Sequence, residues 1–144
     1  MRRRLTFVVA ALGMLISALP LWAHHAFAAE FDAKKTVKVR GKVAKVELIN
    51  PHSWLHVDVE NPDGTTTRWM FEAGTPNVLP RRGFTKNSLP IGTEVIVEGF
   101  QAKDGSNRAN GRDVTFPDGK KIFLGSPVPG EGPPSDAEKD SGKQ

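Results

Sequence analysis

Cysteine is absent from this chain of 144 residues. Disulfide bonds and thiolate metal ligands are therefore excluded, even in an oxidising compartment. The chain also lacks a run of ~20 apolar residues, the length that crosses a bilayer as a helix. Its longest apolar run, from Leu5 to Leu19, is shorter than that. We therefore expect no membrane-spanning segment in the mature protein, and its stability has to come from packing.

A strong charge of either sign is also lacking once the N-terminal segment is set aside. The whole chain has 20 Lys and Arg against 16 Asp and Glu. Three of these cations are Arg2, Arg3 and Arg4, so 17 remain against 16 acidic residues. Because a protein that binds nucleic acid presents a strongly basic surface, this balance argues against nucleic acid as a partner.

Catalytic motifs are missing as well. The chain contains no G-x-S-x-G, no H-E-x-x-H and no glycine-rich phosphate loop, which are the short motifs that carry hydrolase, metalloprotease and nucleotide chemistry. We therefore assign no catalytic residue and expect a binding protein rather than an enzyme.

The N-terminal segment is typical of a secretory signal peptide. Three arginines precede the apolar run, Pro20 ends it, and a short polar region follows. We predict cleavage after Ala23, which makes residues 1–23 the signal and leaves a soluble periplasmic protein; cleavage after Ala28 is the alternative. Both general and twin-arginine export remain open.

The mature chain divides into one domain and a tail. Residues 24–124 have globular composition and the length of one small domain. Residues 125–144 are rich in proline and glycine, and the last ten contain no aromatic or β-branched residue. Such a segment cannot bury enough apolar surface to offset its ordering entropy, so we predict a disordered C-terminal tail.

The domain is dominated by alternation of apolar and polar residues, which is typical of strands. Val37, Val39 and Val43 alternate with basic residues, and the phase of the pattern shifts between Val43 and Ala44. A β-bulge produces such a shift. Further strands are expected over residues 55–60, 65–71, 93–101, 112–116 and 121–124.

Turn signals separate these strands. Glycine-containing turns are expected at residues 61–64, 103–105 and 117–119. Thr75 and Pro76 are typical of a helix start, and Pro80 is expected to end that helix within about a turn. The pattern predicts an all-β fold, namely a small closed barrel of the OB type with five to six strands and one short helical insert. A β-sandwich is the alternative.

Five blocks of sequence resemble a known family. They are His24-His25-Ala26-Phe27-Ala28-Ala29-Glu30-Phe31-Asp32, Gly41-Lys42-Val43, Asn50-Pro51-His52-Ser53-Trp54, Leu79-Pro80-Arg81-Arg82-Gly83-Phe84 and Ala102-Lys103-Asp104-Gly105-Ser106. Together they are similar to the domain of unknown function 6152, a family of small exported bacterial proteins. The resemblance implies export and a compact β-domain, and it implies no activity.

The histidines are the candidate metal ligands. His52 and His56 lie four residues apart, which places them ~13 Å apart along a strand, too far for both to bind one ion at ~2.0 Å. After cleavage at Ala23, however, the α-amine and imidazole of His24 would form a chelate for copper. His25, His52 or His56 would add a nitrogen ligand, and His52 ranks first among them.

Two other interpretations of the histidines stay open. In the first, the N-terminal pair is an exposed arm that binds copper or nickel adventitiously. In the second, His52 is buried, with its ring hydrogen-bonded in the turn that follows Asn50 and Pro51. In either case the protein would have no metal cofactor.

A second constellation is aromatic and basic. Trp54 together with Arg81 and Arg82 could stack on a ring or sugar and pair with a carboxylate. Trp69 and Phe71 belong to the same constellation. The competing interpretation is that they are core residues, since the core of a small barrel needs large aromatic side chains. We therefore expect an exported, monomeric or weakly associating binding module. It would bind or deliver copper or, alternatively, serve as an adaptor for a small ligand or a periplasmic protein partner.

Overall fold

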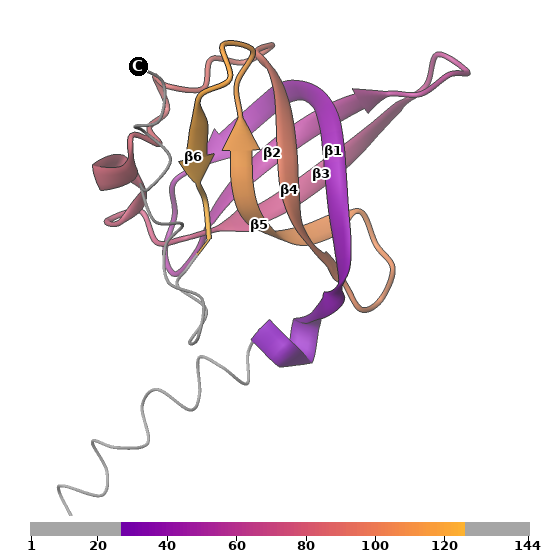
Figure 1. The fold of residues 1–144 in the computed structure, drawn as a ribbon, viewed down its shortest axis with the longest axis horizontal. Coiled ribbons are helices and arrows are strands. Elements are labelled where there is room, and N and C mark those ends of the chain that lie inside the picture. Colours follow the sequence, from indigo (N-terminus) through magenta and orange to yellow (C-terminus); the bar gives the residue numbers. More distant parts are fainter. Residues whose placement is uncertain (1–26, 126–144) are drawn as a thin grey trace, which may run out of the picture. The chain divides into compact units, whose positions relative to one another are not determined.

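The computed structural model describes residues 27–125. Residues 27–30 are helical. Six strands follow, with one short 3₁₀ helix between the third and the fourth (Figure 1): β1 (Phe31–Glu47), β2 (Ser53–Glu60), β3 (Thr66–Ala73), η1 (Leu79–Arg82), β4 (Glu94–Ala102), β5 (Arg108–Thr115) and β6 (Lys121–Phe123). The predicted all-β class is confirmed. Three predicted features lie outside the described residues. They are the signal peptide of residues 1–23, the histidine pair His24 and His25, and the tail from residue 126 to residue 144.

Hydrogen bonds connect five strands in a ring. The sheet order is β3-β2-β1-β4-β5-β6, and β3 also pairs with β5. The β3–β5 pairing is parallel and joins Met70 with Arg108, whereas the neighbouring strands in the sheet order are antiparallel. The hydrogen bonds thus close through five strands, and the helical insert lies between β3 and β4, as expected. No described helix has the length and apolar character needed to span a membrane.

The long strand β1 lies between β2 and β4 in the ring and pairs with both. It pairs with β4 from Thr36 to Lys42 and with β2 from Lys42 to Glu47, and its register shifts between Val43 and Lys45. The bulge expected at this point is confirmed. Glycine at position 41 allows β1 to approach β2 closely, because a Cβ there would lie 2.4 Å from the carbonyl oxygen of Asp58.

The core lies inside the ring and is formed by alternate residues of the strands. Leu55 and Val57 of β2, Phe71 of β3, and Val97 of β4 are fully buried. Trp69 packs against this core and stacks on Phe71, with ring centroids 6.0 Å apart. Because inward residues alternate with outward ones, the neighbouring positions on β2 and β3 face the outer surface.

The helical insert differs from the expectation. It begins at Leu79 rather than near Thr75, and Pro80 lies within its first turn instead of ending it. Proline is tolerated there because the first N–H groups of a helix have no intrahelical partner. The helix ends at Gly83, whose φ of 85° is in the left-handed region. Strand β5 also begins earlier than expected, at Arg108.

Candidate functional site

The strand register brings a group of polar and aromatic residues together on the outer surface. Trp54 pairs with Glu72 across β2 and β3, and Glu72 pairs with Asn110 of β5. In the next row, His56 pairs with Met70, which pairs with Arg108. We call these outward residues the Trp54 face: Trp54, His56, Met70, Glu72, Arg108 and Asn110.

Glu72 is the most unusual residue of the Trp54 face. It is 7% exposed, although it lies on the outer side of the sheet. One of its carboxylate oxygens pairs with Nδ1 of His52, whose side chain is 43% exposed. Burial raises the pKa of Glu72 above its ordinary value, and the pairing with His52 acts in the opposite direction. The carboxylate is therefore held in a poorly solvated position by one imidazole.

His56 is held in a second, separate carboxylate pair. Its Nε2 lies 2.7 Å from Oε2 of Glu47, and the residue is 8% exposed. Lys45 binds the other oxygen of the same carboxylate at 2.5 Å. Hydrogen bonds from Lys45, and then from His56, lower the pKa of Glu47. The two histidines predicted as ligands thus each have one ring nitrogen engaged by a different glutamate.

Trp54 lies between these two pairs along β2. The Arg108 guanidinium lies 5.9 Å from its ring centroid, within the range of a cation–π contact. The loop before β2 contains a cis peptide bond between Asn50 and Pro51. On the other side, the loop before β5 is joined to β3 by the bond from the Met70 N–H to the carbonyl of Asn107, at 2.9 Å. The Trp54 face is therefore bordered by the β1–β2 and β4–β5 loops.

The described residues alone do not assemble a metal centre. Among residues 27–125, no three His, Asp or Glu side chains are grouped so that they could hold one ion. The copper site predicted from the sequence needs His24 as its anchor, and His24 lies outside this range. His52 would contribute through Nε2, because its Nδ1 is engaged by Glu72.

The two arginines of the insert have different surroundings from Trp54. Arg82 donates from Nη1 to the carbonyl of Gly125 at 2.6 Å, and its guanidinium lies 4.9 Å from the ring centroid of Phe123. Arg81 is exposed. Arg82 therefore connects the insert to the end of β6, whereas Trp54 contacts β5.

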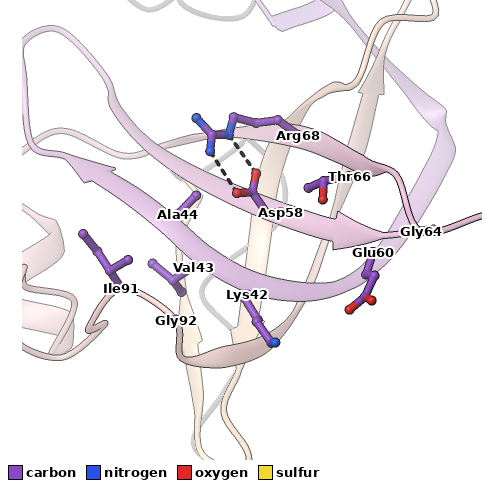
Figure 2. A pocket seen from close by; sticks show the side chains of 10 residues that line it. All are labelled: Lys42, Val43, Ala44, Asp58, Glu60, Gly64, Thr66, Arg68, Ile91 and Gly92. Carbon is purple, nitrogen blue, oxygen red and sulfur yellow. Dashed lines mark hydrogen bonds and ion pairs between the residues drawn. The ribbon is translucent and has the colours of Figure 1, made fainter.

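A groove of about 410 Å³ lies at the other end of β2 and β3 (Figure 2). Across its surface, Arg68 binds both carboxylate oxygens of Asp58, at 2.8 and 2.9 Å. The hydrogen bond from Arg68 lowers the pKa of Asp58. Ile91, which is 79% exposed, stands at the rim. Asp58 and Arg68 thus satisfy each other across this groove.

Sequence reasoning missed four members of the Trp54 face, namely Met70, Glu72, Arg108 and Asn110, and also missed Glu47, the partner of His56. Glu72 could have been found from the hydrophobic pattern. If Leu55 and Phe71 both face the core and pair across the hairpin, then Trp54 has to face Glu72. Arg108 could not have been found in this way, because its strand was expected to begin four residues later and its partner strand is parallel.

The family described as a family of unknown function, DUF6152, matches residues 12–111. No curated protein and no solved structure matches the chain.

Proposed function

Because the chain belongs to the DUF6152 family of unknown function, we propose a function from the chemistry of its own residues. The protein is an exported periplasmic binding module, and the Trp54 face is its ligand site. The ligand is a small molecule or a segment of a partner protein that stacks on Trp54 and hydrogen-bonds to the polar groups beside it. The module binds this ligand without transforming it.

The burial of Glu72 carries this proposal. An ionisable group on an outer sheet face would ordinarily remain in water, since removing a carboxylate from water costs free energy. Here the carboxylate is buried, and its pKa is raised. A titratable group perturbed by burial and by one specific partner is typical of functional sites. The half-buried Trp54 beside it provides a flat apolar surface with a polar rim.

The position of the Trp54 face within the fold supports the same assignment. In OB-type folds, ligands bind on the face of strands 2 and 3 between the loops that follow strands 1 and 4. The Trp54 face has this location, bordered by residues 48–52 and 103–107. This argument is an analogy of fold, and the choice of ligand rests on the side chains.

The test is a ligand screen on the mature protein followed by NMR. A panel of sugars, nucleosides and aromatic carboxylates is titrated while the backbone amide and indole N–H signals are recorded. We expect shifts centred on Trp54, Met70 and Asn110, and at least tenfold weaker binding in Trp54→Ala. Trp69→Phe is the matched control, because Trp69 packs against the core. Binding that leaves Trp54 unshifted, or that survives Trp54→Ala, would contradict the proposal.

Copper binding is the second candidate, and the two histidine–glutamate pairs favour it. Histidines that ligate metals almost always engage a carboxylate or carbonyl through their other ring nitrogen. His52 and His56 each have such a partner. Because the two are too far apart along β2 to share one ion, we propose His24 as the anchor. In that case His52 supplies the additional nitrogen, ahead of His25 and His56.

Electron paramagnetic resonance of Cu(II) added to protein matured by export tests this second candidate. We expect a tetragonal nitrogen-rich signal that loses one nitrogen in His52→Ala. One extra residue before His24 should remove the signal, because it displaces the chelating α-amine. An unchanged signal in the extended protein would exclude His24 as the anchor.

A further inference from the structure

One edge of β1 is left without a strand partner. From Thr36 to Gly41, β1 pairs with β4 on one side (Figure 1). Its pairing with β2 on the other side begins only at Lys42. Within residues 27–125, no strand pairs with this second side before Lys42.

The backbone direction along this edge follows from Val43. The Val43 N–H donates to the Thr93 carbonyl at 2.9 Å, and its carbonyl accepts from the Gly92 N–H at 2.7 Å, so both backbone groups of Val43 point toward the β4 side. Successive residues of an antiparallel strand direct these groups to alternate sides. Thr36, Lys38 and Arg40 therefore direct their N–H and C=O groups away from β4. We call these three residues the β1 edge.

The charged residues from Lys34 to Lys42 are all basic. Lys38 and Arg40 are exposed and pair with Glu98 and Glu94 of β4. Lys34, Lys35 and Lys42 are exposed, and none of them has an ion pair within residues 27–125. Basic residues on an edge strand oppose pairing between two copies of the same edge. The charge therefore favours an acidic strand over a second copy of this chain.

We propose that an extended acidic segment of a partner protein adds to the β1 edge as an antiparallel strand. Its backbone hydrogen-bonds to Thr36, Lys38 and Arg40, as in other cases of strand addition. Its carboxylates pair with Lys34, Lys35 and Lys42, which have no ion pair within the described residues. This surface lies on the β1–β4 side of the ring and is independent of ligand binding at the Trp54 face.

Amide hydrogen exchange of the wild-type protein tests the proposal directly. The probe is a synthetic eight-residue peptide of alternating Glu and Val. In the free protein, the amides of Val37 and Val39 should exchange slowly and those of Thr36, Lys38 and Arg40 quickly. Saturating peptide should slow the latter three at least tenfold. Absence of binding at millimolar peptide, or binding that leaves these amides fast, overturns the proposal.

Two comparisons separate the backbone and charge contributions. A peptide of alternating Lys and Val should bind at least tenfold more weakly, and added salt should weaken the acidic peptide. Lys38→Pro removes an N–H that does not bond to β4, so it should preserve the fold while weakening the peptide at least tenfold. Lys86→Glu, in the exposed segment between η1 and β4, is the charge control and should bind as the wild type does. Equal binding of the acidic and basic peptides would overturn the choice of an acidic partner.

Discussion

The Trp54 face and the β1 edge each contain an ion pair with a glutamate, but the glutamate is buried in the first pair and the lysine is exposed in the second. On the Trp54 face, Glu72 is buried, and His52 supplies its only ion pair within residues 27–125. Along the β1 edge, Lys38 is 66% exposed at its side chain while it pairs with Glu98. A desolvated group needs its partner, whereas a solvated group retains water as an alternative. Disrupting a pair should therefore matter far more at the first surface than at the second.

The largest effect is expected at Gly41, which directly precedes the part of β1 that pairs with β2. Gly41→Ala would place a Cβ 2.4 Å from the Asp58 carbonyl oxygen and 2.7 Å from a methyl carbon of Val57. Since the first contact is with backbone, β1 and β2 would have to separate. We expect a loss of about 3 kcal/mol in the free energy of unfolding, measured with urea.

Arg40→Ala is the neighbouring control for Gly41→Ala. Arg40 is exposed, and its pair with Glu94 is also exposed, so its removal should cost less than about 1 kcal/mol. If the two variants were equally stable, the close approach of β1 and β2 at Gly41 would not be a determinant of the fold.

Most of the strand pattern was predictable, because alternation, turns and the bulge are local properties. The shift at Val43/Ala44 and the glycine turns were recovered in this way. Registers are harder, since they depend on exact turn geometry. The Asn61 N–H bonds to the Thr65 carbonyl, so the hairpin turn is one residue longer than the four-residue signal. A slip of one residue would have placed Phe71, rather than Glu72, opposite Trp54.

The environment of the candidate site was less predictable than its location. Sequence alternation placed His52, Trp54 and His56 on the outer side of the sheet; the strand pairing agrees for Trp54 and His56, whereas His52 precedes β2. It could not show that Glu72 and His56 would be buried on that side, because burial there depends on contacts between distant strands. The parallel pairing of β3 with β5, which brings Arg108 to Trp54, has no local sequence signal.

The second largest effect is expected at His52. His52→Ala would leave the buried carboxylate of Glu72 without its imidazole partner. We expect a destabilisation of about 1–2 kcal/mol at pH 7, the usual cost of an unsatisfied buried group, and partial restoration in the double variant with Glu72→Gln. Thermal and urea unfolding of the wild type, the two single variants and the double variant gives the coupling free energy between His52 and Glu72. Additive effects would mean that the pair is not coupled.

The pH dependence of stability sharpens the same contrast. Because burial raises the pKa of Glu72 above 4.5, the folded state holds that proton more tightly than the unfolded state does. The contribution of Glu72 to stability is therefore greatest below pH 4.5 and falls as the pH rises through its raised pKa. We expect the stability of the wild type relative to Glu72→Gln to decrease over this range. A difference that rises with pH would show that the pairing with His52 dominates.

The smallest effect is expected at the pair of Lys38 and Glu98. The Lys38 Nζ lies 2.8 Å from the Glu98 carboxylate, and the hydrogen bond from Lys38 lowers the pKa of Glu98. Because Lys38 is mostly solvated, Lys38→Ala should cost less than about 0.5 kcal/mol in urea unfolding, and the cost should vanish in high salt. A cost as large as that of His52→Ala would remove the distinction between the two surfaces.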